Sequence, residues 1–106
     1  MGPDHPETAV TLNNLASLLL AGGRITVAES LQRRALHILE NKLSPENPRI
    51  ATVCGNLADI LRAKGDRSGA ERLYRRALSI DEAAFGPRHP DVELYRDKLG
   101  SLLKEP

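Results

Sequence analysis

Two stretches of the chain decide its fold: LNNLASLLLAGGRITVAESLQRRALHI at residues 12–38 and CGNLADILRAKGDRSGAERLYRRALSI at residues 54–80. They lie 42 residues apart, and in an alignment of residues 2–43 with 44–85, 18 of the 42 pairs are identical. A shorter third copy, 86–106, holds half a unit. Repetition at such a period is the signature of stacked structural repeats, so we read the chain as an array of repeated units.

Each full unit predicts two helices joined by a short turn. Apolar residues recur at steps of three and four in both halves of the unit, which gives each helix one apolar stripe. Gly23 and Gly65 end the first helix of each unit, because glycine tolerates the left-handed backbone of a helix end. The predicted stripes are Ala9, Leu12, Ala16 and Leu19, then Ala28, Leu31, Ala35 and Ile38, with Ala70, Leu73, Ala77 and Ile80 as the second copy.

The segments between units share one pattern, seen in GPDHP, SPENP and GPRHP. Pro6, Pro48 and Pro90 suit the first turn of a helix, where the missing N–H is no loss. The earlier proline of each segment, Pro3 in the first, stops the preceding helix from continuing. His5 and His89 occupy the same place in this segment, which favours a structural role for both over catalysis.

Composition sets the broad class of the protein. Aromatic residues make up only 3% and apolar residues 41%, so the core must be built from aliphatic side chains, which favours helices. The net charge of +1 gives no large field that would attract nucleic acid or an anionic membrane. No apolar run could span a bilayer, no signal peptide is visible, and the lone Cys54 permits a reducing compartment. We expect one all-α domain over residues 1–106 in a cytoplasmic protein.

The two quoted stretches resemble the tetratricopeptide repeat family, and the 42-residue spacing with the GPDHP segment resembles the kinesin-light-chain type. Leu15, Ala16, Gly23, Ala28 and Ala35 carry this resemblance, together with their copies 42 residues later. It implies an all-α helix-turn-helix solenoid with repeats 2–43 and 44–85 and a capping half-repeat 86–106. Gln32 departs from the family pattern, because an aromatic residue is usual there and Tyr74 fits in the second repeat.

We expect the last helix to cover the second repeat. Five apolar residues would form the covering face, while charged residues on the other side would face water. The covering residues are Val92, Tyr95, Leu99, Leu102 and Leu103. The first helix has no preceding repeat, so we expect a surface with Leu12 and Leu18 to remain exposed.

The resemblance implies that the first helices of the repeats line a concave groove that binds protein or peptide. Asn14 and Asn56 are equivalent positions, and a carboxamide can both donate and accept hydrogen bonds to a peptide backbone. The alternative is that these asparagines brace neighbouring helices. Arg62 and Lys98 could favour an acidic ligand, although Asp59 and Asp97 oppose this. The candidate groove residues are Val10, Asn13, Asn14, Ser17, Thr52, Asn56, Asp59, Arg62 and Lys98.

No motif in the chain points to an enzyme, a cofactor or a metal site. Phosphate-binding loops, dinucleotide fingerprints, nucleophile elbows and metal-ligand spacings are all missing from the sequence. We expect Cys54 to be a buried, inert thiol. Glu29 stands four residues before Arg33, and Glu71 four before Arg75, which predicts helix-surface ion pairs rather than a nucleic-acid surface.

Two functions remain open. The first is a non-catalytic protein-interaction module that binds an extended peptide or partner helix in its groove. The second is a structural spacer or a self-association element, as a fragment of a longer repeat array whose open ends stack on other copies. The sequence does not name the partner.

Overall fold

The structure is a computed structural model that describes residues 5–105, and this part of the chain holds five α-helices and no β-strand. The all-α prediction is therefore confirmed. Pro3, predicted to interrupt a helix, lies outside the described residues. The helices are α1 Pro6–Ala21, α2 Ile25–Lys42, α3 Pro48–Lys64, α4 Arg67–Phe85 and α5 Pro90–Leu103.

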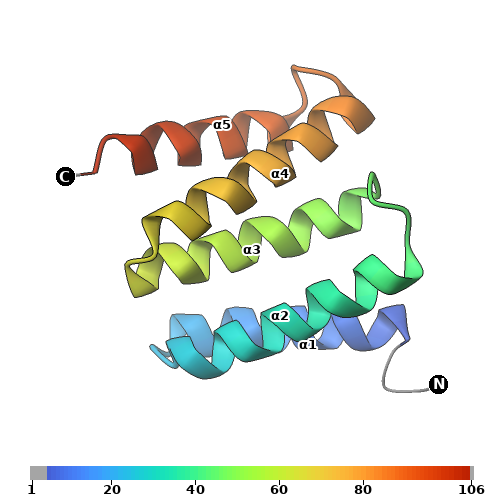
Figure 1. Ribbon diagram of the computed structural model, residues 1–106, viewed down its shortest axis with the longest axis vertical. Coiled ribbons are helices and arrows are strands. Elements are labelled where there is room, and N and C mark those ends of the chain that lie inside the picture. Colours follow the sequence, from blue (N-terminus) through green and yellow to red (C-terminus); the bar gives the residue numbers. More distant parts are fainter. Residues whose placement is uncertain (1–4, 106) are drawn as a thin grey trace.

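The helices stack in chain order, from α1 and α2 at one end to α5 at the other (Figure 1). α1 packs on α2 and α3 packs on α4 as two helical hairpins, and α3 and α5 each pack on the hairpin that precedes them. The result is an elongated body of 42 × 32 × 19 Å, in which each hairpin contacts its neighbours along the chain.

The segments between hairpins begin helices as predicted. Proline opens each of α1, α3 and α5. The residue before it caps the helix: Nδ1 of His5 accepts a hydrogen bond from the backbone N–H of Glu7 at 3.1 Å. His89 caps α5 in the same way, and Asn47 does so in α3 through Oδ1. Both linker histidines thus satisfy backbone donors that a helix start leaves unpaired.

Two glycines make the hairpin turns. Gly23 follows the end of α1 with a φ of 81°, and Gly65 follows α3 with a φ of 95°. Side chains with a Cβ rarely adopt this left-handed backbone, whereas glycine does so freely. The turns bring α2 and α4 back along α1 and α3, so that each pair forms an antiparallel hairpin.

The first helix of the second repeat, α3, carries two apolar stripes. In α3, one stripe contains Ala51, Cys54 and Ala58 and corresponds to the buried Ala9, Leu12 and Ala16 of α1. The other stripe, which we call the junction stripe, faces the preceding hairpin. In α3 it comprises Ile50, Val53, Leu57 and Ile60, all at most 4% exposed.

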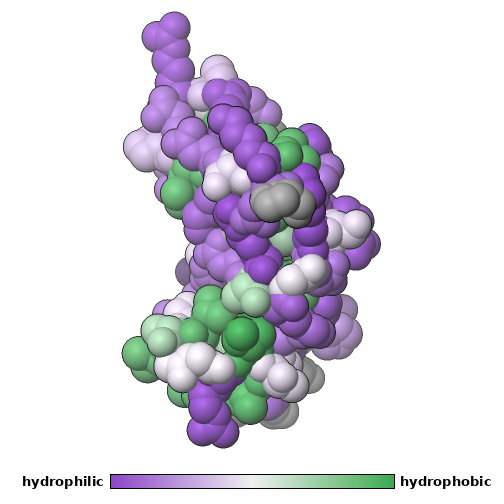
Figure 2. Space-filling model, turned by 90° about the vertical axis from the view of Figure 1, so that its left-hand side faces the viewer, coloured by the Kyte–Doolittle hydropathy of each residue, from purple (hydrophilic) through white to green (hydrophobic). Residues whose placement is uncertain are grey.

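The structure corrects two predicted surface positions. Leu12 was expected on the exposed surface of the first helix, but it is buried at 8% exposure because it lies on the stripe shared within the hairpin. Leu15 is exposed instead, beside Leu18. Leu103 was expected to cover the second repeat, yet it remains 46% exposed. Figure 2 shows hydrophobic residues gathered at the end of the molecule where α1 and α2 lie.

Other predicted features are confirmed. Cys54 is fully buried, and this burial raises the pKa of its thiol to about 11, so it stays protonated and unreactive at neutral pH. The predicted ion pairs form along α2 and α4, with Arg33 Nε 2.9 Å from Glu29 and Arg75 Nε 3.0 Å from Glu71. Lys64 also contacts Glu29, which links α2 to α3.

Candidate functional site

The candidate groove residues lie on α1, α3 and α5, and we call the surface that these helices form together the groove face. Side chains on this face connect each first helix to the next. Asn56 of α3 reaches Asn13 of α1, and Lys98 of α5 reaches Asp59 of α3. The groove face therefore has two halves, one between α1 and α3 and one between α3 and α5.

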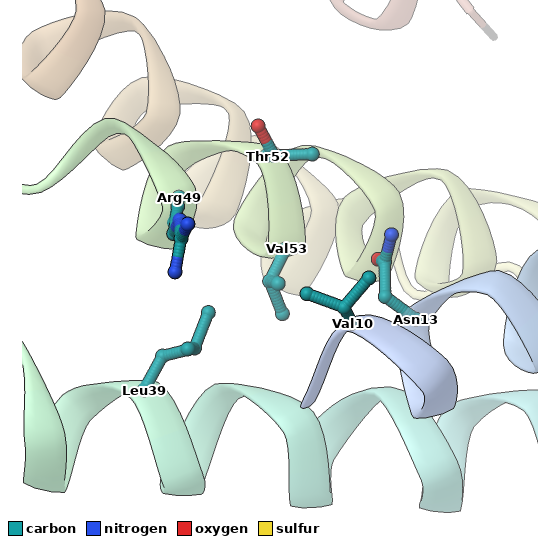
Figure 3. Close-up of a pocket in the computed structure, with 6 residues that line it drawn as sticks. All are labelled: Val10, Asn13, Leu39, Arg49, Thr52 and Val53. Atoms are coloured by element: carbon teal, nitrogen blue, oxygen red, sulfur yellow. The ribbon is translucent and has the colours of Figure 1, made fainter. Parts of the chain in front are cut away.

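The first half contains a pocket of about 210 Å³ between α1 and α3. In Figure 3, Leu39 rises from α2 toward α3, while Arg49 and Val53 point down toward it and Val10 approaches from α1. Val10 is 48% exposed, so the apolar wall is open to solvent. The pocket is lined by Val10, Asn13, Leu39, Arg49, Thr52 and Val53.

An amide cluster borders this pocket. Oδ1 of Asn13 accepts hydrogen bonds from Nδ2 of Asn56 at 2.8 Å and from Nε2 of Gln32, which comes from α2 and is fully buried. Two amides, one from α2 and one from α3, thus donate to a single acceptor on α1. Because buried polar groups are costly without partners, this cluster holds α1, α2 and α3 in one register.

The cluster fixes which amide groups remain for a ligand. The oxygen of Asn13 and the amino group of Asn56 are used within the protein. This leaves the amino group of Asn13 as a donor and the oxygen of Asn56 as an acceptor. A donor and an acceptor side by side match the C=O and N–H groups of a peptide backbone.

The second half of the groove face is charged and internally paired. Nζ of Lys98 lies 2.9 Å from both carboxylate oxygens of Asp59, which also accepts a hydrogen bond from the hydroxyl of Tyr74. Burial, and then the bond to Asp59, raise the pKa of Tyr74 well above its usual range. Tyr74 therefore stays a donor, and the three side chains link α3, α4 and α5.

Arg62 is paired as well. Its Nε lies 2.7 Å from a carboxylate oxygen of Glu105, and its Nη2 donates to the hydroxyl of Ser101 at 2.9 Å. The two cations that the sequence offered for an acidic ligand, Arg62 and Lys98, are thus both bound to carboxylates of the chain itself. The basis for a preference for acidic ligands in this half is weakened accordingly.

The remaining predicted residues are exposed on the groove face. Asn14 makes no side-chain hydrogen bond within residues 5–105, and this part of the chain holds no helix before α1 that it could reach as Asn56 reaches Asn13. The hydroxyls of Ser17 and Thr52 bond to carbonyls one turn earlier in their own helices. The structure thus joins Asn56 to Asn13, while Asn14 stands apart from the amide cluster.

Sequence reasoning missed four residues that shape this face: Leu39, Arg49, Gln32 and Glu105. Gln32 could have been found from the sequence, because it stands where the second repeat has the aromatic Tyr74. Both residues extend from the second helix to the polar cluster of their half. Arg49 and Leu39 belong to different helices, so their meeting in the pocket required the tertiary structure.

Among residues 5–105, no group of three or more histidine, cysteine, aspartate or glutamate side chains could hold a metal ion. In the same part of the chain, none of the helices is long and apolar enough to cross a membrane.

The family model for the tetratricopeptide repeat matches the sequence twice, over residues 8–49 and 50–91. The chain belongs to the tetratricopeptide repeat family. The matched units have the predicted 42-residue length, although each begins six residues later than the repeats set from the linkers. Repeats of this family are in general protein-interaction modules, and the repeats here have the helical hairpin form.

Solved structures support the kinesin-light-chain-like type. The crystal structure of BtubC (BKLC) from P. vanneervenii is 27% identical with a TM-score of 0.87, and the match covers 92% of this chain and 39% of that one. A putative kinesin light chain from Podosopora anserina with nearly identical TPR-like repeats is 22% identical, with a TM-score of 0.90 over 96% and 48% of the two chains.

A single-substitution variant of the Podosopora anserina protein matches at 21% identity and a TM-score of 0.80, over 98% of this chain and 49% of that one. The chain thus spans less than half the length of each of these solved structures. None of the curated proteins compared with it matches its sequence.

Proposed function

We propose that this tetratricopeptide repeat domain is a non-catalytic binding module that holds an extended peptide segment of another protein along its groove face. The single observation that carries this proposal is the Asn13–Asn56 pair beside the pocket. It offers one donor and one acceptor in a fixed orientation, next to a cavity with an apolar wall.

The two features recognise different parts of a peptide. The amide pair can bond to one backbone C=O and one backbone N–H, which every sequence provides. The pocket accepts a side chain, and a volume of about 210 Å³ lined by Val10, Leu39 and Val53 fits an apolar one. The first half of the groove face therefore supplies both affinity and selectivity. In the second half the charged side chains are paired with one another and are not free to bind a ligand.

The test begins with a displayed library of random linear peptides selected against the intact chain. A selected peptide is then titrated against wild type, Asn56→Ala and Asn14→Ala by fluorescence anisotropy. We expect Asn56→Ala to weaken binding about tenfold or more, because it removes a ligand acceptor and releases Asn13. Asn14→Ala should have a smaller effect, because Asn14 lies outside the amide cluster.

Ser79→Ala is the matched control, since Ser79 is an exposed polar residue on α4, away from the groove face. Melting temperatures of all variants separate loss of binding from loss of folding. Equal affinity of wild type and a folded Asn56→Ala variant would rule out the groove assignment.

One observation favours the alternative function, a spacer or self-association element. Leu15 and Leu18 are exposed at the α1 end, where a structural neighbour could cover them. Sedimentation across a wide concentration range distinguishes the two functions, because an element that associates with itself forms larger species as concentration rises, whereas a groove-binding module need not.

A further inference from the structure

Gln32 is a polar side chain at a fully buried position of α2. It is 0% exposed and stands where the second repeat has Tyr74. Its Nε2 donates to Oδ1 of Asn13, while its own oxygen, Oε1, has no hydrogen-bond partner within residues 5–105. A buried polar group with an unpaired atom lowers stability relative to an apolar side chain of similar shape, so packing alone does not account for a glutamine here.

The unpaired oxygen of Gln32 determines the orientation of the whole amide cluster. If all three amides were turned over, both contacts would persist with exchanged roles, and Asn13 would donate to Gln32 and to Asn56. The amino group of Gln32 would then be buried without an acceptor. Two unpaired N–H bonds cost more than one unpaired C=O group, and buried N–H groups without a partner are the rarer case. Gln32 therefore favours the orientation in which Asn13 accepts.

This orientation gives the groove face a polarity. In Figure 3 the amide of Asn13 rises from α1 toward α3. Because its oxygen is bonded within the cluster, Asn13 presents an N–H donor on the α1 side, and Asn56 presents an oxygen acceptor on the α3 side. The Asn13–Asn56 bond alone would form equally well in the reversed sense. Gln32 is thus the member of the cluster that distinguishes the two senses.

A donor and an acceptor in a fixed order distinguish the two directions of a peptide chain. An extended residue presents its own N–H and C=O on one edge, as a closely spaced pair, and the N–H precedes the C=O along the chain. The N–H would bond to the oxygen of Asn56 on α3, and the C=O would bond to the amino group of Asn13 on α1. A peptide bound in this way runs from α3 toward α1.

We propose that Gln32 is a positioning residue that fixes the direction of the bound peptide, with the amino end of the peptide on the α5 side of the amide pair and the carboxyl end on the α1 side. This inference rests on the proposed function, since it requires an extended peptide on the groove face. Gln32 does not touch the peptide but acts through Asn13. The ligand class is therefore an extended segment that is recognised in one chain direction, and the same residues in reversed order should not bind.

The second repeat supplies a variant that separates packing from positioning. Tyr74, the equivalent of Gln32, is fully buried, and its hydroxyl bonds to Asp59. Asp59 corresponds to Ser17 in the first repeat and not to Asn13. A tyrosine at position 32 should therefore fill the buried space without bonding to Asn13. Gln32→Met is a second variant, because methionine has nearly the shape of glutamine and no N–H donor.

The test uses a peptide selected against the intact chain, synthesised with a nitroxide label on its first or on its last residue. Nuclear magnetic resonance of the isotope-labelled chain then shows which backbone amides each label broadens. Val10 of α1 and Leu94 of α5 are suitable reporters, since they occupy equivalent, exposed positions on the two sides of α3. We expect the label on the carboxyl end to broaden Val10 and the label on the amino end to broaden Leu94.

Substitution of Gln32 should relax this preference. Gln32→Met and Gln32→Tyr should each weaken binding about two- to tenfold, and each label should then broaden both reporters, because the amide pair can bind the peptide in either direction. Leu36→Met is the matched control, since it changes a partly buried residue of the same helix and leaves the cluster intact. A purely structural role of Gln32 would lower the melting temperature without changing which reporter each label broadens.

The outcomes separate this inference from the proposed function. A peptide that depends on Asn56 but lies with its carboxyl end near Leu94 would overturn the inference alone. An unchanged single direction in folded Gln32→Met and Gln32→Tyr variants would do the same. Equal affinity of wild type and Asn56→Ala for the peptide would overturn the groove assignment and, with it, the role of Gln32.

Discussion

The molecule contains two junctions of the same design, α3 on the first hairpin and α5 on the second, and they agree in packing but differ in polar chemistry. The four positions of the junction stripe are buried in both helices, as Ile50, Val53, Leu57 and Ile60 in α3 and as Val92, Tyr95, Leu99 and Leu102 in α5. The 42-residue register therefore determines which positions are buried, whichever apolar residue occupies them.

The polar contacts beside the stripe differ position by position. At the first junction Asn13 and Val53 leave room for an amide cluster and an open pocket. At the second, Gly55 stands in the place of Asn13 and the larger Tyr95 in the place of Val53, and the tyrosine ring fills the space beside the glycine. A half with an amide cluster and an open pocket, and a half with internally paired charges, thus arise from the same backbone arrangement.

The largest expected effect concerns one stripe position in three helices. Leu57→Ala and Leu99→Ala should each lower the free energy of unfolding by about 2–5 kcal/mol, because each empties a buried site. Leu15→Ala, at the equivalent but 44% exposed position of α1, should cost less than about 1 kcal/mol. Urea denaturation followed by circular dichroism measures all three, and a cost at Leu15 equal to that at Leu57 would show that the α1 stripe is covered in solution.

The second prediction tests the fit between Gly55 and Tyr95. A Cβ added at Gly55 would lie 2.5 Å from Cε1 of Tyr95, so Gly55→Ala should destabilise the protein by about 1–3 kcal/mol. Gly100 in α5 is also helical but has open space around it, so Gly100→Ala should stabilise by about 0.5–1 kcal/mol. Thermal melts of the two variants should therefore move in opposite directions, and parallel shifts would argue against this tight contact at the second junction.

Most of the fold could be predicted from the sequence, because its determinants are local or periodic. The helix starts at Pro6, Pro48 and Pro90 and the turns at Gly23 and Gly65 depend on residues within a few positions of each other. The buried stripes follow from spacing along one helix. The predictions that Leu12 would be exposed on α1 and that Leu103 would be buried by the second repeat were wrong, since each residue lies beside the boundary between a buried and an exposed face of its helix.

The candidate site could be predicted only in part, because its contacts cross between helices. The bond between Asn56 and Asn13 joins residues 43 positions apart, and it selects Asn13 over the repeat-equivalent Asn14. Gln32 reaches the same cluster from a third helix. The repeat alignment identifies equivalent positions, but it does not determine which neighbouring residue a polar side chain bonds to. The pairing of Arg62 with Glu105 could not be predicted for the same reason.

The smallest expected effect on stability concerns Asp81, a buried carboxylate at the second junction that has no counterpart at the first. This carboxylate is 2% exposed, it stands where the first repeat has Leu39, and its Oδ1 has no hydrogen-bond partner within residues 5–105. Burial and then the nearby Asp91 raise the pKa of Asp81 above its ordinary value, partly opposed by His89. The folded state therefore holds this proton more tightly than the unfolded chain does, so Asp81 contributes stability at low pH that is lost as pH rises through its folded-state pKa.

Asp81→Asn removes this dependence, because an amide has no charge to bury. We expect the variant to gain about 1 kcal/mol of unfolding free energy at pH 7, and the gain should shrink as the pH falls toward 4. Asp97→Asn on the exposed surface of α5 is the matched control and should show no such trend. Unfolding free energies of wild type and both variants, measured at pH 4 and pH 7, test this prediction. An equal gain for Asp81→Asn at both pH values would mean that ionisation of Asp81 does not weaken the second junction.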